Sequence, residues 1–397
     1  MDDQWYLSSE CWRRHLLDDL LRHWLEHAPD RQHGGYVTDF DRHWQPTGTG
    51  EKTLVSQTRL IYNFCCGYRH TGCDEFRLAA EHGLTFLRER FADPTHGGWV
   101  WQCRRDGKVT DPRKDTYGHA FAIFALAEYA RAFDCSDASS LARQTVAVLQ
   151  DRMSDHQHGG LWTRAAGDWQ PDTSGRSQNP HMHLLEALLS LHAVTTDPAV
   201  LDLAVGICRL ARQRFIHPQH GCLEEFFAAD WSPLDDDQAA PVQVGHQFEW
   251  AWLLNRIADR GEDHGFRHLA TTLMAWGSRH GWDQRHGGVF DQCDRCGRVL
   301  RDSKTFWVQS EALRALLYDS CRGVTTHRAA LDSSGRFVWQ HCIDHEQGGW
   351  FTTVGRDGRP ISSDKGSAWK ADYHMVSLCD EALRLLAPDA GKPAAAR

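Results

Sequence analysis

The sequence predicts an all-α fold, an (α/α)6 barrel in which six inner helices stand inside a ring of six outer helices. The first observation behind this prediction is a repeat: a histidine or a nearby residue precedes a glycine pair, or its remnant, six times in 397 residues. The first glycines lie 63, 62, 62, 66 and 61 residues apart, so one unit of about sixty residues occurs six times. The second observation is that every unit holds two helical patterns, one amphipathic and one apolar nearly all round.

The helix pattern ahead of each glycine pair is amphipathic. Apolar residues recur three and four positions apart, with Arg, Glu and Asp between them, which is typical of a helix with one buried face. These outer helices are expected at Cys11–Leu25, Phe76–Phe91, Ser140–Met153, Val200–Phe215, Phe266–Trp276 and Ala329–Cys342.

A short alternating segment with a glycine turn follows each glycine pair. Trp99–Cys103 leads into Asp106-Gly107, and Val289–Asp291 leads into Cys296-Gly297. Such segments predict short β-hairpins that link the helices. The repeat histidines are expected to stabilise these turns through their ring nitrogens, because one residue per unit around a ring cannot converge on one metal ion. They are His33, His96, His158, His220 and His286.

The second helix of each unit is apolar over most of its circumference, which predicts a buried inner helix. The inner helices are expected at Thr53–Cys66, Tyr117–Ala130, Met182–Ala193, Phe248–Ile257, Thr305–Tyr318 and Tyr373–Leu386. Six full repeats followed only by a short tail favour a closed ring over an open helical solenoid, which is the alternative. We expect a single catalytic domain over residues 1–388 and a flexible tail over 389–397.

Composition narrows the class of function. The net charge of -9 and pI near 6.3 argue against a nucleic-acid partner. No apolar run reaches the length of a membrane span, and the start lacks a signal-peptide pattern, so we expect a cytoplasmic protein without a membrane partner. Thirteen scattered cysteines are typical of buried thiols in a reducing compartment. Cys293 and Cys296 form a lone CxxC, for which a structural zinc is the less favoured alternative. The sequence leaves open whether the protein is a monomer or a homodimer.

Closure of the ring would bring all six inner-helix starts to one end of a central cavity. Polar residues gather at these starts, although the helices are otherwise the most apolar in the chain. His246 and Glu249 are three residues apart, as are His183 and Glu186, so each carboxylate is expected to support its imidazole. Trp307 and Glu311, four apart, offer the flat apolar surface and the acceptor that suit a sugar. The alternative is that these groups are internal ion pairs bracing the barrel, above all Glu186 and Lys304.

Four of these polar stretches resemble the signature segments of the N-acylglucosamine 2-epimerase superfamily. They are Asn179–Glu186 (NPHMHLLE), Gly245–Leu254 (GHQFEWAWLL), Phe306–Ala312 (FWVQSEA) and Trp369–His374 (WKADYH). The superfamily includes N-acylglucosamine and cellobiose 2-epimerases and aldose–ketose isomerases. The resemblance covers all six repeats in order and agrees with the barrel that the repeat predicts.

The resemblance implies proton transfer beside a sugar carbonyl, through ring opening and a cis-enediolate, without a cofactor or a metal. The two catalytic histidines of the family match His246 and His374. We expect His374 to move the proton between C2 and C1, and His246, supported by Glu249, to act as general acid and base, although these roles could be exchanged. His183 matches a third histidine that helps to open the ring. The expected substrate-binding residues are Arg59, Tyr117, Asn179, His183, Glu249, Trp307, Glu311, Trp369 and Asp372.

Within the superfamily, the run Gln57–Leu60 and the pair His181 and His183 look most like the mannose isomerase branch. We therefore expect conversion of the monosaccharide D-mannose to D-fructose, with D-lyxose and D-xylulose as further substrates. A sugar 2-epimerase of the mannose/glucose, cellobiose or N-acylglucosamine type is the alternative. Less favoured are an (α/α)6 glycoside hydrolase that uses Glu249 and Glu311 and a sugar-binding protein without activity.

Overall fold

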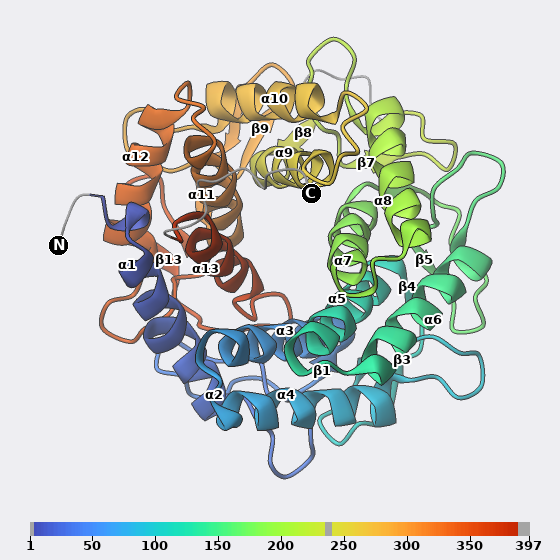
Figure 1. Cartoon of the computed structure of the whole chain (residues 1–397). Coiled ribbons are helices and arrows are strands. Elements are labelled where there is room, and N and C mark those ends of the chain that lie inside the picture. The colour runs from blue at the N-terminus through green and yellow to red at the C-terminus, as the bar shows by residue number, and fades with distance from the viewer. Residues whose placement is uncertain (1–3, 235–239, 388–397) are drawn as a thin grey trace, which may run out of the picture.

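The computed structural model, described here for residues 4–234 and 240–387, is a closed double ring of helices (Figure 1). This confirms the (α/α)6 barrel. The expected tail, 389–397, lies outside the described residues. The inner ring consists of α3 (Leu54–Thr71), α5 (Thr116–Phe133), α7 (Asn179–Thr195), α9 (Val244–Ala258), α11 (Phe306–Cys321) and α13 (Tyr373–Leu385).

The outer ring follows the amphipathic segments. It consists of α1 (Ser9–Arg14) with α2 (Arg22–His27), α4 (Asp74–Phe86), α6 (Ser136–Met153), α8 (Pro198–Leu210), α10 (Phe266–Trp276) and α12 (Arg328–Phe337). A short 3-10 turn, Trp5–Leu7, precedes the ring, and π-helical turns join α1 to α2 and extend four other outer helices: His15–Leu21, Leu87–Phe91, Ala211–Phe215, Gly277–Gly281 and Val338–Cys342. In α4, burial of Phe76, Ala79, Ala80 and Gly83 marks the expected single apolar face.

Five small antiparallel sheets lie at the end of the barrel where the inner helices begin. The strands are β1 (Lys52–Thr53), β2 (Gln102–Cys103) and β3 (Val109–Asp111); β4 (Lys114–Asp115) and β5 (Arg164–Ala165); β6 (Arg176–Ser177) and β7 (Phe226–Phe227); β8 (Pro241–Gln243), β9 (Gln292–Asp294) and β10 (Val299–Arg301); and β11 (Lys304–Thr305), β12 (Thr353–Val354) and β13 (Pro360–Ser362). In each sheet the strand before one inner helix pairs with the strand after the next glycine pair, as Lys52 does with Cys103. The sheets therefore join consecutive repeats.

The repeat histidines do not stabilise the turns in the way the sequence suggested. In the described residues their rings make no hydrogen bond, and the turns are held by other groups of the repeat. In the first unit, Asp30 accepts from the backbone N–H of His33 and pairs with the buried Lys52 at 3.0 Å. Gln57 of α3 accepts from the N–H of Tyr36 at 2.7 Å. At Gly35, where φ is 63°, a Cβ atom would lie 2.6 Å from Gln57, which explains the glycine.

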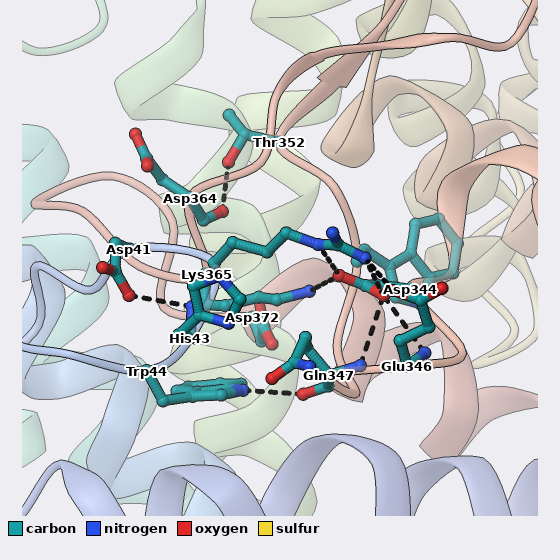
Figure 2. Close-up of polar contacts among 12 residues, drawn as sticks. Asp41, His43, Trp44, Asp344, Glu346, Gln347, Thr352, Asp364, Lys365 and Asp372 are labelled. Atoms are coloured by element: carbon teal, nitrogen blue, oxygen red, sulfur yellow. Dashed lines mark hydrogen bonds and ion pairs between the residues drawn. The ribbon is translucent and has the colours of Figure 1, made fainter.

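Contacts between the first and last repeats close the ring. In the outer ring, Trp350 donates its indole N–H to Nε2 of His15 at 2.8 Å. At the hairpin end, Figure 2 shows Asp344 paired with Lys365 at 2.8 Å, and the same carboxylate accepts from Arg42 of the first repeat at 2.8 Å. In the inner ring, α13 packs between α11 and α3 (Figure 1). An open solenoid has no such contacts, so the solenoid alternative was wrong.

Two further properties bear on the sequence predictions. No helix within residues 4–234 and 240–387 is long and apolar enough to cross a membrane. Cys293 of the CxxC pair is buried in β9 and donates its thiol hydrogen bond to the carbonyl of His280 at 3.3 Å.

Candidate active site

The starts of all six inner helices contribute side chains to one cluster around the barrel axis. The ring centroids of Tyr117 and His183 lie 4.9 Å apart, and those of His183 and His374 lie 6.4 Å apart. Trp307 connects the two expected catalytic histidines, at 4.9 Å from His246 and 6.0 Å from His374. The structure thus brings together histidines that are 63 and 128 residues apart in the chain.

His246 is held by a carboxylate that the sequence did not indicate. Both oxygens of Glu225 lie close to its Nδ1, at 2.8 and 2.9 Å. Gln178 donates to Glu225 at 2.9 Å, and Trp250 fixes the amide of Gln178 by donating to its oxygen at 2.6 Å. The carboxylate accepts the proton on Nδ1, so Nε2, which makes no hydrogen bond among the described residues, is left to accept a proton.

Glu249 does not support His246, which corrects the prediction from their spacing. Its carboxylate instead lies 4.0 Å from Nδ1 of His183. The sequence did not indicate Glu225, because this residue precedes β7 in a hairpin and does not lie at the start of an inner helix. The signal that could have indicated it is the pair Glu224-Glu225, which stands in an otherwise apolar segment after Gly221 of the fourth repeat. Both side chains are buried, and Glu224 pairs with Arg295.

His374 has a carboxylate partner of the same kind. Oε1 of Glu311 lies 2.7 Å from Nδ1 of His374, and Arg314, one turn further along α11, pairs with the other oxygen. Burial lowers the pKa of His374 well below its usual value, and the nearby Arg59 lowers it further. Burial also raises the pKa of Glu311. The imidazole is therefore neutral near pH 7 and able to accept a proton through Nε2.

Two more buried carboxylates, Glu249 and Glu186, belong to this cluster. Burial and the neighbouring Glu311 raise the pKa of Glu249 well above its usual value. Neither oxygen of Glu249 has a hydrogen-bond partner among the described residues. Glu186 differs: burial alone would raise its pKa, but His183 and Arg314 lower it to about 2. The two carboxylates thus differ: the surroundings of Glu249 favour its neutral form, whereas those of Glu186 favour the ionised form.

The first two inner helices contribute Arg59 and Tyr117 to the cluster. Arg59 donates to the hydroxyl of Tyr117 at 2.7 Å and to the carbonyl oxygen of Trp369. Its guanidinium lies 4.4 Å from the ring centroid of Phe121 and 5.1 Å from that of Tyr373. Arg59 thus places a positive charge beside the cluster, and its role toward an oxyanion stays a prediction.

The remaining predicted residues fall into different positions. Asn179 starts α7, and its side-chain oxygen has no partner among the described residues. Trp369 is 56% exposed, so most of its indole is available at the mouth of the cluster. Asp372 is fully buried and accepts from the indole of Trp24 at 2.9 Å, so it braces the start of α13. Lys304 is also structural, because it pairs with Asp283 of the hairpin loop at 3.2 Å.

The carboxylates and histidines could in principle hold a metal ion. Within the described residues, His183, Glu186 and Glu249 form one such group, and Glu249, Glu311 and His374 form another, each with ligand atoms within 4.8 Å of one another. Arg314 already supplies positive charge to Glu186 and Glu311. Neither observation decides whether an ion binds, so the expectation that the enzyme needs no metal stays a prediction.

Two histidines, each held by a carboxylate in one buried cluster, have the arrangement that acid–base catalysis requires. Comparison with known proteins then identifies the family. Residues 34–378 match the model of the N-acylglucosamine 2-epimerase (GlcNAc 2-epimerase) family. The chain belongs to this family, and it is a sugar isomerase or epimerase, as the resemblance implied.

Individual relatives agree with the family model. The chain is 31% identical to the D-mannose isomerase of Marinomonas mediterranea, over 89% of this chain and 92% of the relative. It is 24% identical to the cellobiose 2-epimerase of Bacteroides fragilis, over 94% and 97% of the two chains. A crystal structure of a D-mannose isomerase superposes with a TM-score of 0.89 at 28% identity, covering 96% of this chain and 98% of the other.

Proposed function

We propose that the protein interconverts D-mannose and D-fructose by acid–base catalysis without a cofactor. The single observation that carries this proposal is the pair of carboxylate-oriented imidazoles, Glu225–His246 and Glu311–His374, with Trp307 within 6.0 Å of both histidine rings. The likeness to two D-mannose isomerases supports the choice of substrate.

In the proposed reaction the sugar ring opens first. In this scheme His246 and His183 exchange protons with the ring oxygen and the C1 hydroxyl. His374, neutral and held by Glu311, takes the proton from C2. The electron pair of the broken C–H bond forms the C1–C2 double bond of the enediolate, and the former carbonyl oxygen gains the negative charge. Arg59 stabilises this oxyanion.

The second half of the reaction returns the proton to C1. His374 protonates C1 while the hydroxyl proton on O2 passes to His246, so that the carbonyl forms at C2. His246 then gives this proton to the oxyanion on O1. The product is the ketose, with no net gain or loss of protons. The same arrangement is expected to convert D-lyxose to D-xylulose, since the reacting portion from C1 to C4 is similar.

A 2-epimerase is the second candidate, favoured by the match to a cellobiose 2-epimerase along almost the whole of both chains. It needs the same enediolate, with the proton returned to the opposite face of C2. A glycoside hydrolase is disfavoured, because its candidate acids, Glu249 and Glu311, are at most 1% exposed, and Glu311 is engaged by His374.

Product analysis after incubation with D-mannose in deuterated water tests the proposal. We expect D-fructose with deuterium at C1. Glucose without fructose, labelled at C2, would refute isomerisation and establish the epimerase. Release of reducing ends from an oligosaccharide, with no change to mannose, would refute both.

A further inference from the structure

Arg314 of α11 is a buried arginine that contacts side chains of three inner helices. It is 1% exposed and lies about one turn after Glu311 in the same helix. Its guanidinium nitrogens lie 2.5 Å from Oε2 of Glu311 and 3.5 Å from Oε1 of Glu186 in α7. The guanidinium also lies 3.9 Å from the ring centroid of Trp252 in α9, the helix between α7 and α11 in the inner ring (Figure 1). Arg314 therefore connects two helices that are not neighbours in the ring.

Each of the two carboxylates that Arg314 contacts also lies beside a histidine of the cluster. In Glu311, Arg314 approaches Oε2, and Oε1 lies 2.7 Å from Nδ1 of His374. In Glu186, Arg314 approaches Oε1, and Oε2 lies 3.7 Å from Nδ1 of His183. In both cases the guanidinium takes one oxygen of the carboxylate and the imidazole takes the other. Two histidine–carboxylate pairs from different repeats thus share one guanidinium.

The charge of Arg314 matters because both carboxylates are buried. Among the described residues, it is the only lysine or arginine within 4.0 Å of the carboxylate of either Glu311 or Glu186. Burial raises the pKa of Glu311 to about 7, and Arg314 opposes this rise. An ionised Glu311 accepts the proton on Nδ1 of His374, which leaves Nε2 without a proton. A protonated Glu311 could instead donate to Nδ1, and the proton of the neutral imidazole would then lie on Nε2.

We propose that Arg314 is a positioning residue that holds Glu311 and Glu186 so that each carboxylate orients its own histidine. Its planar guanidinium offers different nitrogens to the two carboxylates, and its stacking on Trp252 fixes the plane in which they lie. Nε2 of His374 is then kept able to take the proton from C2. This inference rests on the proposed function, because it concerns the same histidines, but it applies equally to isomerisation and to epimerisation.

Steady-state turnover of D-mannose by Arg314→Met and Arg314→Lys tests the kinetic consequence. Methionine keeps apolar contact with Trp252 and removes the charge, so we expect kcat to decrease about 10- to 100-fold with KM within about threefold of the wild type. Lysine restores the charge and should give at least about fivefold more turnover than methionine. The matched control is Arg69→Met near the carboxyl end of α3, because Arg69 also bridges two carboxylates, Glu128 at 2.6 Å and Asp380 at 2.7 Å. It should lower the melting temperature and leave kcat within about threefold of the wild type.

The position of the imidazole proton gives a readout that does not depend on activity. In ¹⁵N NMR spectra of histidine-labelled protein, the signals of His374 are those lost in His374→Gln. We expect the proton on Nδ1 in the wild type and in Arg69→Met, and on Nε2 in Arg314→Met. Should Arg314→Met fail to fold, Arg314→Met/Glu186→Gln, which removes one buried charge of each sign, is compared with Glu186→Gln alone and should have the lower kcat.

Three results would each overturn the proposal. They are a kcat of Arg314→Met, or of the double variant against Glu186→Gln, that stays within about twofold of its reference, equal losses in the lysine and methionine variants, and a His374 proton whose position does not change. A wild-type protein that does not convert D-mannose would count against the proposed function alone. The NMR comparison of wild type and variant would still decide whether Arg314 positions Glu311 and His374.

Discussion

Replacing Glu225 with glutamine keeps the shape of the side chain beside His246 and removes its negative charge. Both carboxylate oxygens lie within 2.9 Å of Nδ1, and Gln178, itself held by Trp250, occupies the remaining side of the carboxylate. A glutamine can still accept one hydrogen bond from Nδ1–H. It cannot stabilise the imidazolium that forms each time His246 accepts a proton.

The size of the effect follows from this difference. A hydrogen bond to a charged group is worth about 1.5–3 kcal/mol, and one between neutral groups is worth about 0.5–1.5 kcal/mol. The loss of about 1–2 kcal/mol in the transition state corresponds to a decrease in kcat of roughly 5- to 30-fold. Glu225→Ala also removes the group that orients the imidazole, so we expect it to decrease kcat by about 100-fold or more. KM should change little in Glu225→Gln, because Glu225 contacts His246 and is not one of the predicted substrate-binding residues.

Steady-state turnover of D-mannose, with the ketose quantified by chromatography, measures these effects. The matched control is Glu224→Gln, because Glu224 is the adjacent buried carboxylate and pairs with Arg295 instead of His246. Glu224→Gln should lower the melting temperature and leave kcat within about threefold of the wild type. If Glu225→Gln keeps kcat within about twofold, the assignment of Glu225 as the positioning residue of His246 is wrong.

The other predictions concern catalysis, metal dependence and stability. His246→Ala and His374→Ala, each with a wild-type circular dichroism spectrum, should decrease kcat by about 10²- to 10⁴-fold; near-normal rates in either variant would contradict the two-histidine mechanism. Dialysis against EDTA should leave turnover unchanged, and loss of activity that zinc or manganese restores would show a metal site. Asp344→Asn should lower the free energy of unfolding by about 3 kcal/mol in urea titrations, because Lys365 loses its buried partner, whereas the exposed Glu346→Gln should change it by less than about 0.5 kcal/mol. Although burial opposes it, Arg42 and Lys365 lower the pKa of Asp344, so its contribution is present above the unfolded-state pKa of about 4 and is lost as the pH falls below that value. Equal acid sensitivity of Asp344→Asn and the wild type would contradict this account.

The repeat of about sixty residues was enough to predict the (α/α)6 barrel. Five glycine pairs and a sixth copy reduced to Gly221 divided the chain. Apolar spacing distinguished half-buried outer helices from buried inner ones, because each pattern follows from how much of a helix surface meets solvent. Every expected inner and outer helix is present. The error at the turns has a local cause: His33 and its equivalents are prominent in the motif, but Asp30, Lys52 and Gln57, which hold the first turn, lie up to 27 residues apart in the chain.

The candidate site was predicted in part. The repeat placed four of its residues at inner-helix starts, and therefore at one end of the barrel: His246, His374, His183 and Arg59. Pairing within a helix was right for His183, whose Nδ1 lies 3.7 Å from Glu186, and wrong for His246. The i, i+3 rule assigned Glu249 to His246, but in a closed ring an inward side chain is as near to neighbouring helices and hairpins as to its own helix.

By itself, the sequence determined the fold class, the closed ring of repeats and which helix starts carry polar side chains, because burial periodicity and repeat length are local properties of the chain. The tertiary structure alone decided which carboxylate orients which histidine, that Glu225 takes part, and that Asp372 and Lys304 brace the scaffold. These relations join residues from different repeats, and their distances depend on how the ring closes.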